Sequence, residues 1–214
     1  MRTYVSTLGY HETRVTRPIL KRGIDGGDEV VVVRPATNDD DERAAEALAD
    51  VERLLSGIEP DVSLAAEGVP HDDFGDAVLA CSDLLRAADG TVVVNFGGGA
   101  REVFLALATA TLAHLDRVDE TLFFRDTDHS VRKWELPNLA ANPPDETTKT
   151  LRTLANVEGP VSISELARDS DVATSTVGRH VSKLADAGAV RTTNAGKSKQ
   201  VELTLTGRLL LRTA

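Results

Sequence analysis

The chain has 214 residues, 41% of them hydrophobic, and its 24 basic residues against 34 acidic ones leave a net charge of −10. This composition supports one large or two modest packed domains and excludes a wholly disordered chain. The longest mostly apolar run, at 103–115, is too short to cross a bilayer, and no apolar signal segment precedes the first predicted strand. We therefore expect a cytoplasmic protein without a membrane partner. Cys81 is the only cysteine, which excludes an internal disulfide and a cysteine-based metal cluster.

Charge is distributed unevenly along the chain. Residues 1–144 carry 14 Lys and Arg against 26 Asp and Glu, whereas residues 145–214 carry 10 against 8. This asymmetry favours two modules that face different partners. The excess of Asp and the preference for Arg over Lys favour a halophile's protein, kept soluble in concentrated salt, and an ordinary acidic cytosolic protein is the alternative. In concentrated salt a basic surface would add little to DNA binding, so an acidic chain does not exclude a nucleic-acid partner.

The first part of the chain alternates short apolar runs with helical patterns. Strands are predicted at 3–8, 29–34, 61–66, 91–96 and 120–125. Helices are predicted at about 12–22, from Asn38 or Asp39 to Leu55, at 72–88 and at 100–115. Residues 130–136 are predicted to return as a hairpin strand. The alternation indicates βαβ units, and therefore an α/β fold with a Rossmann-like, mostly parallel sheet and helices on both faces.

A Pro- and Asn-rich linker is predicted at 137–145, between a first domain over 1–136 and a second over 146–214. The second domain begins with a helix at about 146–157. It continues as a helix, a tight turn, a second helix and a hairpin, with the hairpin turning through Asn194-Ala195-Gly196. This order predicts a small winged helix-turn-helix domain.

The second helix of this motif carries two different faces. Thr174 is expected to cap it, and Val177, Val181 and Leu184 fall within one apolar stripe. The remaining surface has hydroxyls near its start and cations further along, which suits a helix that contacts base edges and phosphates in the major groove. Two lysines beside the hairpin turn can contact the DNA backbone. The candidate DNA-binding residues are Ser175, Thr176, Arg179, His180, Lys183, Lys197 and Lys199.

Residues 146–214 resemble the winged helix-turn-helix domains of archaeal and bacterial transcription regulators, most specifically in the segment STVGRHVSKLADAGAV. The resemblance implies double-stranded DNA as a partner. Two alternatives remain open: a three-helix packing domain with a solvated face, and a winged domain that binds protein or only dimerises.

Two glycine-bearing loops, STLGYHETR and VNFGGGAREV, follow the first and fourth predicted strands. In a sheet of the order 3-2-1-4-5-6 these strands are neighbours at the switch point, where ligands bind. Glycines allow close approach of the backbone, and the start of a helix with Arg101 attracts an anion such as phosphate. Thr7, Tyr10, His11 and Asn95 add hydroxyl, ring and amide groups. The pattern is neither a dinucleotide fingerprint nor a P-loop, and loops that only make tight turns are the alternative.

Both loops, as STLGYHETRVTRP and NFGGGAREV, resemble the ligand-facing motifs of the CRISPR-associated Rossmann-fold (CARF) regulators of archaea, in which a CARF domain is fused to a winged helix. The resemblance implies a homodimer with a cyclic oligoadenylate, foremost the tetra-adenylate, bound across its two-fold axis. It also implies promoters of CRISPR-associated genes as targets. Glu12 departs from the family's basic loops and would be unfavourable beside a phosphate. Carried over by position, the ligand-binding residues are Thr7, Leu8, Gly9, Tyr10, His11, Asn95, Gly97, Gly98, Gly99 and Arg101.

We predict no catalytic residues, no metal site and no cofactor beyond this regulatory ligand, and thus a protein that is not an enzyme. One alternative is a ring nuclease that cleaves its cyclic ligand through a ribose 2′-hydroxyl, with Arg101 and Thr7 supplying position and charge. Another is a winged-helix regulator that senses a different nucleotide or metabolite in the same crevice.

Overall fold

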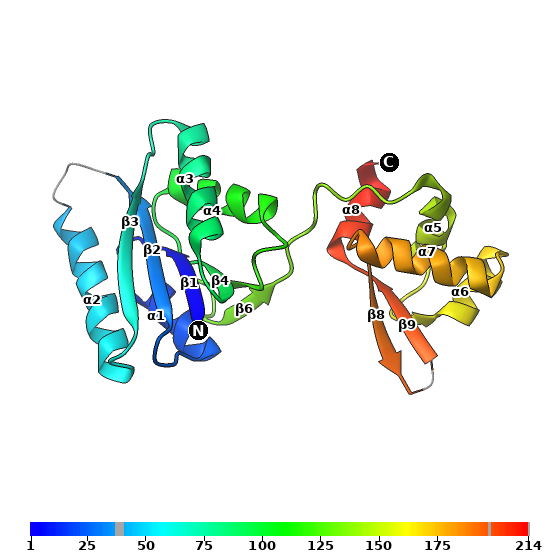
Figure 1. The fold of residues 1–214 in the computed structure, drawn as a ribbon, viewed down its shortest axis with the longest axis horizontal. Coiled ribbons are helices and arrows are strands. Elements are labelled where there is room, and N and C mark those ends of the chain that lie inside the picture. Colours follow the sequence, from blue (N-terminus) through cyan, green and yellow to red (C-terminus); the bar gives the residue numbers. More distant parts are fainter. Residues whose placement is uncertain (37–40, 197, 214) are drawn as a thin grey trace. The chain divides into compact units, whose positions relative to one another are not determined.

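Figure 1 shows the computed structural model, which describes residues 1–36, 41–196 and 198–213. The chain divides into two units, Met1–Glu135 and Leu136–Ala214, and each is described by itself. Within the described ranges, none of the helices combines the length and the apolar content that crossing a bilayer requires.

The first unit is built on a six-stranded sheet with the strand order β3-β2-β1-β4-β5-β6. Neighbouring strands from β3 to β5 pair in parallel, whereas β6 pairs with β5 in the antiparallel direction. The strands are β1 (Arg2–Thr7), β2 (Glu29–Pro35), β3 (Ser63–Val69), β4 (Thr91–Phe96), β5 (Glu120–Phe124) and β6 (Val131–Trp134). This topology confirms the predicted Rossmann-like α/β fold and the order that places β1 beside β4.

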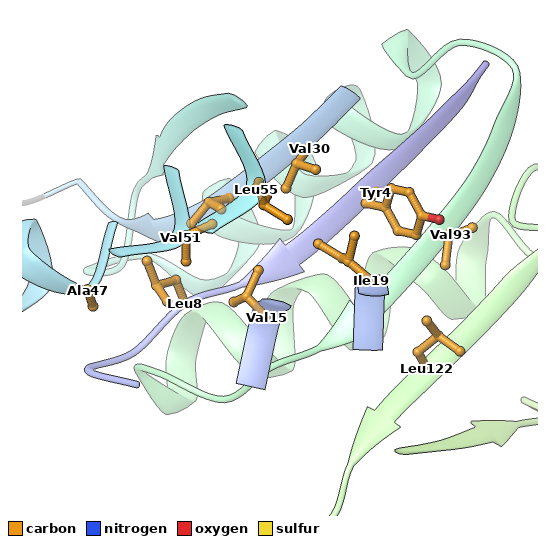
Figure 2. Packing of buried hydrophobic residues seen from close by; sticks show 11 residues of the cluster. Tyr4, Leu8, Val15, Ile19, Val30, Ala47, Val51, Leu55, Val93 and Leu122 are labelled. Carbon is orange, nitrogen blue, oxygen red and sulfur yellow. The ribbon is translucent and has the colours of Figure 1, made fainter. Parts of the chain in front are cut away.

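Helices alternate with the strands of this sheet: α1 (Thr13–Arg22), α2 (Glu42–Ile58), α3 (Phe74–Ala87) and α4 (Arg101–Ala113). Side chains of α1 and α2 form one buried cluster with sheet residues that include Val30 and Val32 (Figure 2). Val31 and Val33, whose side chains alternate with these and point to the opposite face of the strand, are buried as well. Strand β2 is therefore covered on both faces, which explains why its sequence is a continuous apolar run rather than an alternating one.

Two helices of this unit differ in detail from their predicted form. Helix α2 begins at Glu42, and the Asp41 carboxylate caps it by accepting from the backbone N–H groups of the next turn. Asn38 and Asp39, the predicted starts, lie outside the described residues. Helix α3 begins at Phe74 rather than at residue 72, and the Phe74 side chain is 53% exposed. Cys81 is buried in the same helix, and burial raises the pKa of its thiol to about 11.

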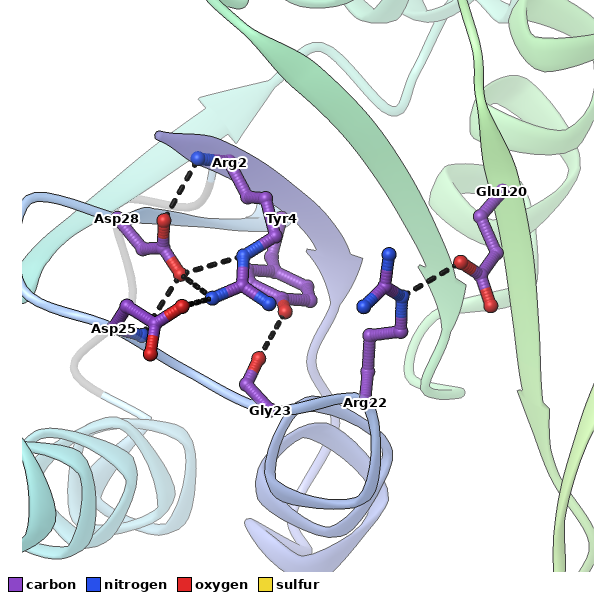
Figure 3. Close-up of polar contacts among 7 residues, drawn as sticks. All are labelled: Arg2, Tyr4, Arg22, Gly23, Asp25, Asp28 and Glu120. Atoms are coloured by element: carbon purple, nitrogen blue, oxygen red, sulfur yellow. Dashed lines mark hydrogen bonds and ion pairs between the residues drawn. The ribbon is translucent and has the colours of Figure 1, made fainter.

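A polar network lies at the amino ends of the strands, at the edge opposite the glycine loops (Figure 3). Asp28 accepts hydrogen bonds from the backbone N–H and from Nε of Arg2, at 2.8 and 2.9 Å, and Arg2 also pairs with Asp25. The buried hydroxyl of Tyr4 donates to the carbonyl oxygen of Gly23. Burial raises the pKa of Tyr4, so the hydroxyl keeps its proton. These bonds fix the turn between α1 and β2 against strand β1.

The second unit begins with a short 3-10 helix, contains a helix-turn-helix and a small antiparallel sheet, and closes with a helix. In chain order they are η1 (Asp145–Thr147), α5 (Thr148–Ala155), β7 (Val161–Ser162), α6 (Ile163–Ser170), α7 (Thr174–Asp186), β8 (Val190–Ala195), β9 (Ser198–Leu203) and α8 (Leu205–Thr213). Strand β9 pairs in the antiparallel direction with β7 on one side and β8 on the other. The α6–α7 pair followed by the β8–β9 hairpin is the predicted winged helix-turn-helix topology. Strand β7 and helix α8 were not predicted.

The core of the second unit confirms the predicted apolar stripe, since Val177, Val181 and Leu184 are fully buried. Ser162 caps α6 in a capping box with Glu165.

Two local predictions for this unit were wrong. Ala173, not Thr174, occupies the N-cap position of α7, and no side chain caps this helix. The hairpin turn begins later than predicted, because Asn194 and Ala195 still pair with Lys199 and Ser198.

Candidate functional site

The two glycine loops meet at the carboxyl edge of the sheet. Strands β1 and β4 pair in parallel, so the loops that follow them leave the sheet side by side. A Cβ added to Gly9 would lie 2.9 Å from the Cα atom of Gly99, and a Cβ on Gly99 would lie 2.5 Å from the carbonyl oxygen of Leu8. Only glycine at positions 9 and 99 permits this approach of backbone to backbone.

The other two glycines of the second loop are equally constrained. A Cβ on Gly97 would lie 2.4 Å from the carbonyl oxygen of Thr7. Gly98 has a φ of +98° and Gly99 a φ of +100°, a backbone region that side chains disfavour. The run of three glycines is thus required by the junction between β1 and β4.

A cavity of about 1000 Å³ opens beside this junction. It extends from the glycine loops across the carboxyl ends of β2 and β3 to the first turn of α2. Predicted ligand-binding residues on its wall are Leu8, Gly9, Tyr10, His11 and Gly99. Residues on the wall that the sequence did not single out include Arg14, Arg34, Asp41, Glu42 and Gly68.

The remaining predicted ligand-binding residues lie elsewhere. Thr7, Asn95 and Gly97 are buried below the loops, and Arg101 is exposed at the first position of α4, off the wall of this cavity. The Asn95 amide donates to Oγ of Ser6 at 2.7 Å and to the carbonyl oxygen of Arg14 at 3.0 Å. Its amide nitrogen therefore ties β4 to β1 and to the start of α1.

Two buried oxygens at this edge have no hydrogen-bond partner among the described residues: Oγ1 of Thr7 and Oδ1 of Asn95. Buried polar atoms usually have a partner in the protein or in water. Both atoms lie below the glycine loops at the carboxyl ends of β1 and β4, off the wall of the cavity.

Tyr10 connects the first glycine loop to α2. Its ring is 49% exposed, and the guanidinium carbon of Arg43 lies 4.4 Å from the ring centroid. The Tyr10 hydroxyl donates to Asp41, the residue that caps α2. This hydrogen bond raises the pKa of Tyr10 and lowers that of Asp41, because it favours the phenol and the carboxylate together.

Arg14, in the first turn of α1, places a cation on the wall of this cavity. Its Nη1 lies 2.9 Å from the point where a side chain at Gly98 would place its Cβ, and its Nη2 pairs with Asp126 at 3.1 Å. Arg34 adds a second cation at the carboxyl end of β2. The sequence held a signal for both: Arg14 stands within the first motif, and Arg34 directly follows the buried run of a parallel strand.

Glu12 does not face this cavity. It lies on the wall of a separate cavity of about 610 Å³ that includes Thr13 and Leu20 of α1. Its carboxylate accepts from Oγ1 of Thr13 at 2.7 Å, and this bond lowers the pKa of Glu12. Glu12 therefore lines a different cavity from the residues of the glycine loops.

The second candidate site is the surface of α7. Ser175 and Arg179 are exposed and Thr176 is half-buried, whereas Lys183 pairs with Glu146 of η1. Lys199 is exposed on β9 beside the hairpin turn, and Lys197 lies outside the described residues. Among the described parts of the chain, no group of three or more His, Cys, Asp or Glu side chains comes together in a way that could hold a metal ion.

His180 is placed differently from the prediction. Its side chain is 7% exposed, and Nδ1 lies 2.8 Å from Oγ1 of Thr150. The sequence assigned it to the DNA-facing surface of the helix, but in the structure Thr150 of α5 packs against it and it is buried. We therefore remove His180 from the candidate DNA contacts.

A Rossmann-like domain with glycine loops at its switch point, followed by a winged helix-turn-helix, defines the class of this protein. Residues 2–130 match the family profile described as the Csa3 CRISPR-associated Rossmann-like domain, and the chain belongs to this family. Residues 145–206 match a second family, described as HVO_A0114. No curated protein matches the sequence.

Several solved structures are similar to parts of the chain. RV1404 from Mycobacterium tuberculosis is 28% identical over 33% of this chain and 50% of that one, with a TM-score of 0.30. The ArsR family transcriptional regulator RHA00566 is 27% identical over 32% of this chain and 75% of that one, with a TM-score of 0.27.

Enterococcus italicus Csm6, solved bound to cyclic hexa-2′-fluoro-hexa-dAMP, has a TM-score of 0.53 at 8% identity. The match covers 89% of this chain and 50% of Csm6. This chain thus spans half the length of RV1404 and of Csm6, and the likeness to Csm6 is one of fold.

Proposed function

We propose that this protein is a homodimeric transcription regulator whose CARF domain binds a cyclic oligoadenylate and whose winged helix binds promoter DNA of CRISPR-associated genes. The observation that carries the proposal is the meeting of the two glycine loops beside a cavity of about 1000 Å³ whose wall includes Arg14 and Arg34. Backbone N–H groups, a helix start and arginines are the groups that bind phosphates. The exposed ring of Tyr10 supplies a surface for a base.

The ligand is proposed to be the cyclic tetra-adenylate. Membership in the Csa3 family supports a regulator of this kind, and the nucleotide-bound state of Csm6 supports a cyclic adenylate as the ligand class. In this proposal the ligand is a regulatory effector and not a cofactor. We also propose that the protein functions in the cytoplasm of a halophilic archaeon. The excess of acidic residues in the first unit supports this, because such an excess suits a protein in concentrated salt.

Dimerisation is proposed to use the outer face of α4. No charged residue stands between Glu102 and His114, and the Leu105 side chain is 55% exposed on this helix. Leu79 of the neighbouring α3 is 64% exposed. Helix α4 also begins directly after the glycine run, so a contact between two α4 helices would bring two ligand sites together.

Ligand and DNA are coupled in this proposal, and the coupling is reciprocal. If the cyclic nucleotide raises the affinity for DNA by some factor, DNA raises the affinity for the nucleotide by the same factor. A two-fold dimer would contact half-sites spaced by about 10–10.5 base pairs or a multiple of that.

Titration calorimetry with cyclic tetra-adenylate tests the ligand. Arg14→Ala is expected to weaken binding about 10- to 150-fold, because a hydrogen bond to a charged group contributes about 1.5–3 kcal/mol. Arg53→Ala, which removes the same charge from an exposed position on α2, is the matched control and should leave binding unchanged. A wild-type protein that binds other nucleotides but no cyclic oligoadenylate would contradict the proposed ligand.

The same mixture, followed over time for linear products, separates a regulator from a ring nuclease. The regulator is expected to return the cyclic ligand intact. Repeated turnover within minutes would instead assign an enzyme, and Thr7→Val and Arg101→Ala would then identify the residues responsible.

A further inference from the structure

Lys183, a candidate DNA contact, is held by an acidic residue of its own domain. Its Nζ lies 2.6 Å from Oε1 of Glu146, and the two side chains are 40% and 53% exposed. Glu146 belongs to η1, the short 3-10 helix that precedes α5. A lysine amine that meets a carboxylate at this distance is bound as it would be by a phosphate oxygen.

Glu146 also acts on the neighbouring part of α7. The hydrogen bond from Lys183 lowers the pKa of Glu146 most, and the charge of Arg179 lowers it further. The carboxylate therefore remains ionised within electrostatic reach of two candidate DNA contacts, one turn apart on the same helix. An anion in this position repels a DNA backbone that approaches α7.

We propose that Glu146 competes with DNA phosphate for Lys183, so that this pair must open before Lys183 can contact the backbone. The inference rests on the DNA-binding function proposed above. Because both side chains are partly exposed, the pair is weak enough to exchange its carboxylate for a phosphate without a large cost. Glu146 thus lowers the affinity of the protein for DNA without preventing DNA binding.

The position of η1 makes the competition adjustable. It begins at Asp145, directly after the segment 137–144 that follows the CARF domain. Thr147, the last residue of η1, donates from Oγ1 to the carbonyl oxygen of Pro144 at 2.7 Å. A change in the path of this segment would therefore move η1, and with it the carboxylate that holds Lys183.

Fluorescence anisotropy with a mixed-sequence DNA duplex several helical turns long, over a series of salt concentrations, tests the proposal. Glu146→Gln keeps the size of the side chain and removes its charge. It is expected to bind DNA roughly two- to fivefold more tightly, the range for an exposed ion pair. In the wild type, the Glu146 carboxylate takes up a cation when Lys183 leaves it for the phosphate. This uptake offsets part of the counterion release and is absent from Glu146→Gln, so the plot of log affinity against log salt should become steeper by up to about 1.

Glu158→Gln is the matched control, since it makes the same charge change at an exposed position in the turn between α5 and β7. It should change neither quantity by a comparable amount. In a Lys183→Met background, Glu146→Gln should lose most of its effect, because the pair that it opens is already absent. Melting curves of all variants verify that the winged domain remains folded.

The outcomes separate the inference from the function on which it rests. If Arg179→Ala weakens DNA binding but Glu146→Gln leaves it unchanged or weakens it, the competition is overturned and DNA binding stands. If Glu146→Gln is tighter to the same extent in the Lys183→Met background, the effect is one of net charge and the specific pair is overturned. If neither the wild type nor any variant binds DNA, both proposals fail together.

Discussion

Gly99 is one of the residues at which the two loops of the ligand site lie backbone against backbone. It combines a φ of +100° with a Cβ position only 2.5 Å from the carbonyl oxygen of Leu8. That oxygen belongs to the backbone, so no rotation of a side chain can relieve the clash. The glycine is thus needed both for conformation and for space, and the loop junction depends on it.

We predict that Gly99→Ala lowers the free energy of unfolding by about 2–3 kcal/mol, from backbone strain together with the displaced Leu8 carbonyl. Gly27→Ala is the control, because Gly27 also has a positive φ, +82°, but no described atom lies within 4 Å of its Cβ position. It should cost about 1 kcal/mol. Urea denaturation measures both, and equal losses would show that space at Gly99 is not limiting.

For single residues, the sequence pattern predicted which side chains are buried better than it predicted which residues they contact. The wheel of α7 assigned Val177 to the buried stripe, because burial along a helix follows its own period. It could not show that Thr150, 30 residues earlier, would meet His180. The pairing of Lys183 with Glu146 was hidden for the same reason, since only folding brings η1 to α7.

At the scale of elements, the turn between α1 and β2 is held to β1 by the network of Figure 3. Asp28 is its centre: the carboxylate is 1% exposed and accepts from Arg2 twice and from the backbone N–H of Asp25 at 3.0 Å. Asp25, which also pairs with Arg2, is 83% exposed. The two carboxylates therefore contribute very differently although both touch the same arginine.

We predict that Asp28→Asn lowers the free energy of unfolding by about 3 kcal/mol, because it leaves the partly buried Arg2 without its main counter-charge. Asp25→Asn should cost less than about 0.5 kcal/mol, as expected for a solvent-exposed ion pair. Thermal and urea unfolding give both values. A larger loss from Asp25→Asn than from Asp28→Asn would contradict this assignment.

The elements that the sequence predicted are those whose own residues carry a strong pattern. The apolar run of β2 and the glycines that follow β4 predicted where these strands of the parallel sheet lie in the sequence. Strand β7 has two residues and takes its form from pairing with β9, so its own sequence carries too short a pattern. Helix α8 contains Gly207, which lowers its intrinsic helix propensity, and its residues gain stability by packing on the core of the winged domain.

At the scale of the whole molecule, the proposed function requires two copies of the chain. We predict that the wild type sediments with twice the 22.9 kDa mass of one chain, and that Leu105→Glu shifts it to the monomer by placing a charge in the α4 contact. Ile58→Glu is the control, because Ile58 is similarly exposed, at 54%, on α2. A dimer that survives Leu105→Glu would place the interface elsewhere.

The sequence by itself determined the α/β class, the strand that begins each βαβ unit, the order that joins β1 to β4, and the glycine loops at their ends. These follow from local rules of periodicity and chirality that act within a few residues. Only the tertiary structure decided that Arg14 and Arg34 line the cavity and that Glu12 does not. It also decided that His180 hydrogen-bonds to Thr150 and that Lys183 forms an ion pair with Glu146. Such contacts join residues far apart in the chain, and their partners are chosen by how whole elements pack.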